Sequence, residues 1–207
     1  VDAGSGASLS IRTTFTLEAW IKSANVNSPQ YQTTINHGSQ GSNGEYWFYL
    51  TNGKVSLEVG DGTSNSFNEN LSSTLDTNWH HIVVTFNSAA IKAYVDGKQT
   101  ASASLAISDT LGGAQTLRIG EYPGAYRFNG LIDEVRVYNR ALSADEVKQH
   151  YDQTKRNFVV ASSNPSSWWT SGLVGYWNFD GQNTTSTNGT RDTSGNNNWG
   201  TFNGGVG

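Results

Sequence analysis

The segment from Gly130 to Ser143, GLIDEVRVYNRALS, constrains the fold more than any other part of this sequence. Its first half alternates with the two-residue period of a β-strand. The alternation predicts a core-facing row made of Leu131, Asp133, Val135 and Val137. We expect the opposite face, which carries Glu134, Arg136 and Tyr138, to meet water at its middle.

A short helix is predicted directly after this strand. Ser143 and Glu146 have the spacing of a capping box, in which each side chain bonds the other residue's backbone N–H. Val147 and Tyr151 stand four apart and give the helix one apolar edge. The pattern therefore indicates a strand that runs into a helix.

The same segment resembles the closing motif of bacterial laminin-G-like domains, which belong to the concanavalin A-like lectin and glucanase superfamily. The resemblance extends from Gly130 to Val147, and the segments 15–22 (FTLEAWIK) and 79–86 (WHHIVVTF) are similar to family patterns as well. It implies an all-β fold: a two-sheet antiparallel β-sandwich of jelly-roll type with one short helix. In that pattern we expect His80 and His81 to be hydrogen-bonded strand residues rather than metal ligands.

Composition narrows the possible partners and location. Only 14% of residues are charged and the net charge is -4, without a basic stripe, which argues against nucleic acid. No apolar run approaches the ~18 residues of a membrane span, so membrane insertion is not expected. The absence of Met indicates that residue 1 is not a translation start, and the polar, Gly-rich composition favours a secreted or cell-surface protein. The resemblance implies a bacterial one.

The order of segments departs from the resembled family. The stretch from Gly172 to Asp180 and the loop 192–198 are similar to the family's opening segment, yet they follow the helix here. We expect a sandwich over 1–157, a linker over 158–171 and a further segment over 172–207. An isolated strand cannot bury its face or satisfy its edge. We therefore favour completion of the same domain, in cis or by exchange with a neighbouring copy, over the start of a next repeat.

Acidic and amide side chains suggest a structural calcium site. An inward carboxylate at Asp133 is costly unless it is hydrogen-bonded, paired or bound to a metal. Oxygen ligands in turn-rich loops suit Ca²⁺, and the resemblance implies such an ion. The predicted ligands are Asp133, Asp180, Asp192 and Asn196. In the alternative, Asp180 and Asp192 only cap turns, and Asp133 accepts backbone hydrogen bonds.

Aromatic and polar residues in or beside loops suggest a glycan site, because sugars bind through flat aromatic faces and fixed polar groups. The predicted ligand-binding residues are His37, Tyr46, Trp47, Tyr122, Tyr126 and Arg127. In the alternative, these aromatic rings only pack the sheet or cover a core edge. The loop with Tyr122, Tyr126 and Arg127 is the best candidate of the group.

Catalytic signatures are not found in the sequence. The glucanase pattern ExDxxE and a Gly-x-Ser-x-Gly elbow are both absent. The sequence therefore predicts a non-catalytic, lectin-like carbohydrate-binding module of a larger protein, with an adjacent domain or neighbouring copy as a further partner. A protein-binding adhesion or spacer domain without a sugar site is the alternative, and an unusual glycosidase is the third.

Overall fold

The structure is a computed structural model that describes residues 1–38, 44–61, 65–68, 70–87, 90–104, 115–157, 167–180, 184–185 and 189–202. Its strands form two main antiparallel sheets. The six-stranded sheet contains, in spatial order, β11 (Leu173–Trp177), β10 (Gly130–Tyr138), β1 (Thr14–Ser23), β6 (His80–Asn87), β7 (Ala90–Val95) and β8 (Lys98–Ser104). The five-stranded sheet contains β5 (Asn65–Asn68), β4 (Lys54–Asp61), β3 (Gly44–Thr51), β2 (Gln32–His37) and β9 (Leu117–Ile119).

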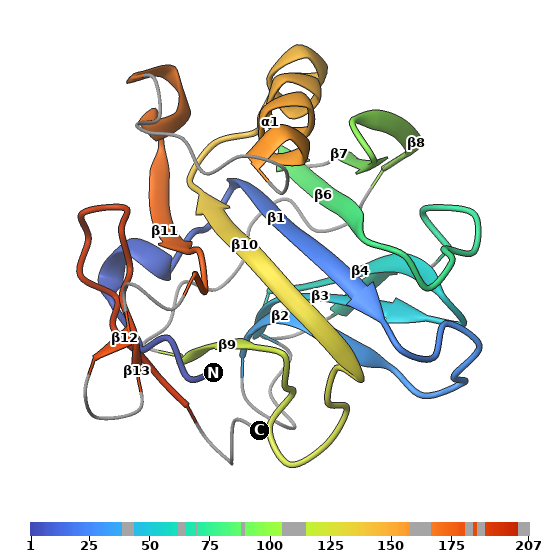
Figure 1. The fold of residues 1–207 in the computed structure, drawn as a ribbon, viewed down its shortest axis with the longest axis horizontal. Helices are drawn as coiled ribbons and strands as arrows, with labels where there is room; N and C mark the ends of the chain where they lie inside the picture. Colours follow the sequence, from blue (N-terminus) through green and yellow to red (C-terminus); the bar gives the residue numbers. More distant parts are fainter. Residues whose placement is uncertain are drawn as a thin grey trace.

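Smaller elements complete the fold. The helix α1 follows β10, and two short 3-10 helices and three two-residue strands lie nearer the chain ends. Their bounds are Ala144–Asn157 for α1, Ala7–Leu9 for η1, Ser167–Thr170 for η2, Thr184–Thr185 for β12, Gly189–Thr190 for β13 and Gly200–Thr201 for β14. Figure 1 shows β10, β1 and β6 side by side, with β2, β3 and β4 in a second layer.

The main hydrophobic core lies between the two sheets. Alternate residues of β1, from Phe15 to Ile21, are buried in it together with Phe48 of β3 and Leu57 of β4. Because side chains of a strand alternate between faces, each sheet directs one apolar row at the other. The predicted all-β sandwich with one helix is therefore confirmed.

A β-bulge in β10 changes the predicted faces of this strand. The pairing with β1 shifts between Glu18 and Trp20, and Glu134 has a left-handed φ of 52°. Such a bulge reverses the alternation. Val135 is buried in the core as predicted, but upstream of the bulge Ile132 packs against the core and Leu131 is 58% exposed. The prediction that Leu131 and Asp133 face the core is therefore wrong.

Helix α1 covers the outer face of the six-stranded sheet. The capping box is present: Ser143 N donates to Glu146 Oε2 at 2.8 Å, and Glu146 N donates to Ser143 Oγ at 3.2 Å. A second apolar cluster joins helix and sheet and consists of Val83, Tyr94, Tyr138, Leu142 and Val147. Arg136 is only 3% exposed beneath this layer, so the prediction that this face meets water is wrong.

The C-terminal segment lies against the rest of the chain. Strand β11 pairs antiparallel with β10, with Val135 opposite Trp177, and the Trp177 side chain is fully buried in the main core. Near the N-terminus, the backbone of Asp2 forms isolated antiparallel β-bridges with Thr201 and with Arg118. Of the expected linker, residues 158–166 lie outside the described residues, as do 181–183, 186–188 and 203–207 of the expected final segment. The boundaries of the domain stay a prediction.

Candidate functional site

An aromatic cluster occupies the outer face of the five-stranded sheet. Trp47 and Tyr49 of β3 alternate with core-facing Phe48, so both rings lie on the face away from the core. Their centroids are 4.2 Å apart in a stacked arrangement, and Trp47 Nε1 donates to Thr33 Oγ1 at 3.0 Å. Tyr31 meets both rings edge-on at 5.3 Å. This packing fixes the rings as a preorganised surface.

The turn 122–126 adds two tyrosines above Trp47. Pro123 and Gly124, with a φ of 74° at Gly124, suit the central positions of a tight turn, and Ala125 N donates to Tyr122 O at 3.0 Å. The Tyr122 ring lies 4.7 Å from Trp47, and Tyr126 stacks on Trp47 at 5.7 Å. The Tyr126 side chain is 41% exposed while Trp47 is 7% exposed. The exposed ring of the cluster is therefore Tyr126, and it lies over the buried ring of Trp47.

Charged side chains flank the cluster. The exposed Arg127 guanidinium lies 3.6 Å from the Glu121 carboxylate. Burial raises the pKa of the Tyr122 hydroxyl, and the nearby negative charge of Glu58 raises it in the same direction. Tyr122 thus stays a neutral hydrogen-bonding group at physiological pH. Of the predicted ligand-binding residues, Trp47, Tyr122, Tyr126 and Arg127 lie in or next to this region.

His37 and Tyr46 do not belong to this surface. They are paired across β2 and β3, and their stacked rings face the core, where both residues are buried. Burial lowers the pKa of His37 to about 4, and Tyr46 donates its hydroxyl proton to Leu9 O at 3.2 Å. Tyr46 and Trp47 are neighbours in one strand and so point to opposite faces. His37 and Tyr46 therefore lie on the core face, away from the aromatic cluster, and their role in ligand binding stays an untested prediction.

The predicted calcium ligands lie in different hydrogen-bonded surroundings. Asp192 is buried, and its two carboxylate oxygens accept four N–H groups at 2.8–3.0 Å, from the backbone of Tyr176, Ser194 and Asn198 and from the Asn198 side chain. Four donors use the lone pairs that a metal would need. Asn196 is exposed, and its amide donates to Leu173 O and Ser194 Oγ. The fit of Asp192 to a cation is therefore poor.

Asp133 in β10 lies near enough to Asp180, after β11, to be affected by its charge. Burial raises the pKa of Asp133 to about 7, against the hydrogen bond from Glu134 N, and the charges of Glu134 and Asp180 raise it further. Among the described residues no three His, Asp or Glu side chains are arranged as a metal site. Calcium binding thus stays a prediction. Of the predicted ligands, Asp133 and Asp180 have the carboxylates that are better able to accept a cation.

A buried ionic network lies under α1, and the sequence analysis did not predict it. Glu18 is fully buried and holds three partners: His81 at 3.0 Å, Arg136 at 3.2 Å and His150 of α1 at 2.7 Å. Burial opposes ionisation of Glu18, but the charges of His150 and Arg136 hold its pKa well below the usual range. The network is structural, since it fastens the helix to the sheet.

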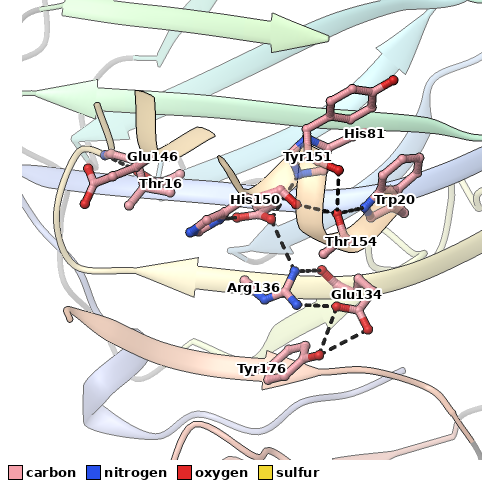
Figure 2. Close-up of polar contacts among 12 residues, drawn as sticks. Thr16, Trp20, His81, Glu134, Arg136, Glu146, His150, Tyr151, Thr154 and Tyr176 are labelled. Carbon is pink, nitrogen blue, oxygen red and sulfur yellow. Dashed lines mark hydrogen bonds and ion pairs between the residues drawn. The ribbon is translucent and has the colours of Figure 1, made fainter. Parts of the chain in front are cut away.

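The network continues toward β11 (Figure 2). The Arg136 guanidinium also bonds the Glu134 carboxylate and lies 4.2 Å from the Tyr176 ring centroid, while Tyr176 donates to Glu134 Oε2 at 2.9 Å. On the helix side Trp20 Nε1 donates to Thr154 Oγ1 at 2.8 Å. The signal in the sequence was Trp20, two residues after Glu18 on the same face: a large ring there indicates a covered face.

The tandem histidines have the hydrogen-bonded roles that were expected. His81 contacts Glu18, and His80 lies 2.9 Å from Asp96 and 3.1 Å from Asp76. The hydrogen bond with Asp96 raises the pKa of His80 above its usual value, against partial burial.

The fold defines a concanavalin A-like sandwich, and the sequence agrees. The chain belongs to the concanavalin A-like lectin/glucanases superfamily, whose family model, Laminin_G_3, matches residues 1–148. Over 108 residues the chain is 30% identical to adhesion G-protein coupled receptor V1 of Danio rerio, a match that spans 51% of this chain and 2% of the receptor.

Solved structures with the same fold come from several bacteria. A candidate carbohydrate-binding protein from Bacteroides ovatus has a TM-score of 0.65 at 21% identity, over 91% of this chain and 51% of that one. Domain 4 of AbnA, a GH43 extracellular arabinanase of Geobacillus stearothermophilus in complex with arabinotriose, has a TM-score of 0.55 at 21% identity, over 69% and 68%. The ligand-binding domain of botulinum neurotoxin serotype D, in complex with N-acetylneuraminic acid, has a TM-score of 0.51 at 17% identity, over 68% and 36%. These likenesses show the shared fold.

Within the described residues, no helix has the length and apolar character needed to cross a membrane.

Proposed function

We propose that this chain is a non-catalytic, lectin-like module that binds glycans on the outer face of its five-stranded sheet. The observation that carries the proposal is the aromatic cluster of Tyr31, Trp47, Tyr49, Tyr122 and Tyr126. Aromatic faces that are held in place and partly exposed suit the apolar faces of sugar rings. The hydroxyls and the charged rim of Glu58, Glu121 and Arg127 supply polar partners for sugar hydroxyls.

The comparisons support the ligand class. Two structural neighbours, domain 4 of an arabinanase and a neurotoxin ligand-binding domain, are in complex with arabinotriose and with N-acetylneuraminic acid. Because identity to both is low, fold analogy alone does not transfer their ligands. The proposal includes a secreted or cell-surface location, as in the extracellular arabinanase, and leaves structural calcium to direct metal analysis.

A glycan array probed with the purified chain tests the function. We expect binding to a restricted set of oligosaccharides and no release of reducing sugar from the bound ones. An array without any binding would contradict the proposal and favour a protein-binding adhesion domain, the role suggested by the match to an adhesion receptor. Hydrolysis of a bound glycan would contradict the non-catalytic part.

A further inference from the structure

Two buried polar atoms lie on the sheet face beneath the aromatic cluster. Asn36 of β2 is paired across strands with Trp47, and Ser56 of β4 is paired with Tyr49. Directly paired residues point to the same face of a sheet. Asn36 and Ser56 therefore lie on the outer face, in the two strands that flank β3.

Neither polar atom has a partner among the described residues. Asn36 Oδ1 and Ser56 Oγ are buried, with Asn36 2% and Ser56 0% exposed, and neither forms a hydrogen bond there. Buried polar atoms are nearly always hydrogen-bonded, and each exception calls for an explanation. Two exceptions on one face, under rings suited to sugars, indicate hydrogen-bonding capacity that a ligand can use.

The layer above these atoms is a strained turn. Tyr126 has a φ of 49°, a left-handed conformation that is unfavourable for a bulky residue. Thr33 N donates to Tyr126 O at 3.2 Å, which ties the turn to β2. Strained backbone at a ligand-facing turn is often part of a binding mechanism. A sugar ring between Tyr126 and Trp47 must lie about 3.5–4.0 Å from each aromatic ring, so the two rings must be about 7–8 Å apart. Their centroids are 5.7 Å apart, so the gap must widen before a sugar can enter.

We propose that one ring of a neutral oligosaccharide inserts between Trp47 and Tyr126, with its hydroxyls bonded to Asn36 and Ser56. This inference rests on the proposed function and names the residues that select the sugar. Asn36 Oδ1 accepts a sugar O–H, while Ser56 Oγ accepts one or donates its own proton. The turn moves outward to admit the ring, and the two aromatic residues then cover both sugar faces.

The surrounding charges favour a neutral sugar. The row that contains Asn36 and Trp47 continues to Glu58, whose carboxylate repels an acidic sugar. Arg118, at the other end of the row, donates to Gly38 O and Thr116 O at 3.4 and 3.5 Å. Arg127 is paired with Glu121. Both arginines of this face thus already bond within the protein, which leaves them less available to hold a carboxylated sugar.

The test uses Asn36→Leu and Ser56→Ala in the full chain, with Tyr126→Ala and Trp199→Ala beside them. Trp199 is an exposed aromatic residue outside the cluster. A glycan array identifies the sugar that binds most strongly. The array carries neutral oligosaccharides, including arabinotriose, and N-acetylneuraminic acid. Calorimetric titration with the selected sugar then gives its affinity for each variant. We expect Asn36→Leu and Ser56→Ala each to weaken binding tenfold or more. Their melting temperatures should stay the same or rise, because each substitution removes a buried polar atom that has no partner.

The possible failures are distinguishable. Normal affinity in both Asn36→Leu and Ser56→Ala, together with weakened binding by Tyr126→Ala, overturns this inference and leaves the proposed function standing. Absent binding by the wild-type chain overturns both. A melting temperature that falls together with affinity assigns Asn36 and Ser56 a structural role and overturns the inference, as does binding restricted to N-acetylneuraminic acid.

Discussion

At the residue scale, Glu18 shows how one buried charge organises a whole face of the molecule. Its carboxylate joins β6, β10 and α1 through His81, Arg136 and His150. Removing one member of a buried ionic group leaves the others without compensation, which costs about 3–5 kcal/mol. We expect Glu18→Gln to lower the free energy of unfolding by about this amount in urea titrations at pH 7, whereas the exposed Asp145→Asn changes it by less than about 1 kcal/mol. Equal effects of the two substitutions would contradict the role of the network.

The same residue predicts a pH dependence. The pKa of Glu18 is depressed in the folded state, so its contribution is complete above the ordinary value of 4.5 and is lost as pH falls through the folded-state pKa. The unfolding free energy of the wild-type chain should therefore decline below pH 4.5, and that of Glu18→Gln should decline less. Parallel declines in the two proteins would show that other groups control acid unfolding.

The sequence could reveal some of these residues and not others. The alternation in β10 correctly predicted that Val135 and Val137 are buried, because both lie downstream of the bulge. It failed for Leu131 and Asp133, since one extra residue in the strand leaves no compositional mark. Arg136 was expected to meet water because strand periodicity cannot show which helix later covers the face.

At the element scale, the bulge in β10 gives Asp133 an unusual electrostatic environment. Its pKa, raised to about 7, means that the folded chain holds a proton that the unfolded chain releases near pH 3.8. Stability therefore falls as pH rises from about 4 to 7. Without calcium, we expect Asp133→Asn to raise the melting temperature at pH 8, because the substitution removes the penalised charge.

Bound calcium would reverse the effect of Asp133→Asn on the melting temperature. An ion that binds only the folded chain stabilises it by mass action, so millimolar calcium should raise the wild-type melting temperature, chelator should lower it again, and Asp133→Asn should respond less. A melt of the wild-type chain that is unchanged by calcium and chelator, with no metal in elemental analysis, would refute the calcium prediction. Asp180→Asn, at the nearby carboxylate, is the matched variant.

At the whole-molecule scale, the C-terminal segment contributes to the core of the sandwich. Trp177 is fully buried, and its Nε1 donates to Asn198 O at 3.0 Å. Removal of such a ring costs about 3–5 kcal/mol. We expect Trp177→Ala to lower the unfolding free energy by that amount and a chain ending at residue 157 to lack a cooperative thermal transition. A truncated chain with an unchanged melting midpoint would show that the segment is dispensable.

The fold was more predictable than the site. The resemblance to family motifs around β1, β6 and β10 implied the sandwich, and the two-residue alternation of these strands agreed with it. The candidate glycan-binding residues could not be chosen so well, because only the strand register shows which face each side chain occupies: His37 and Tyr46 lie on the core face and Trp47 on the outer one. Asn36 and Ser56 carry no signal of their own, since only the paired register places them beneath the aromatic rings.

The central claim is that sugars bind on the aromatic face of the five-stranded sheet. The most direct measurement is a calorimetric titration of wild type, Tyr126→Ala and Trp199→Ala with the strongest neutral ligand from the array. Both substitutions remove a partly exposed ring, Tyr126 at 41% and Trp199 at 49% exposure, but only the first lies in the cluster. Loss of a stacking ring costs about 1 kcal/mol or more, so we expect at least about fivefold weaker binding by Tyr126→Ala and wild-type affinity in Trp199→Ala. Wild-type affinity in Tyr126→Ala, or a loss confined to Trp199→Ala, would contradict the account.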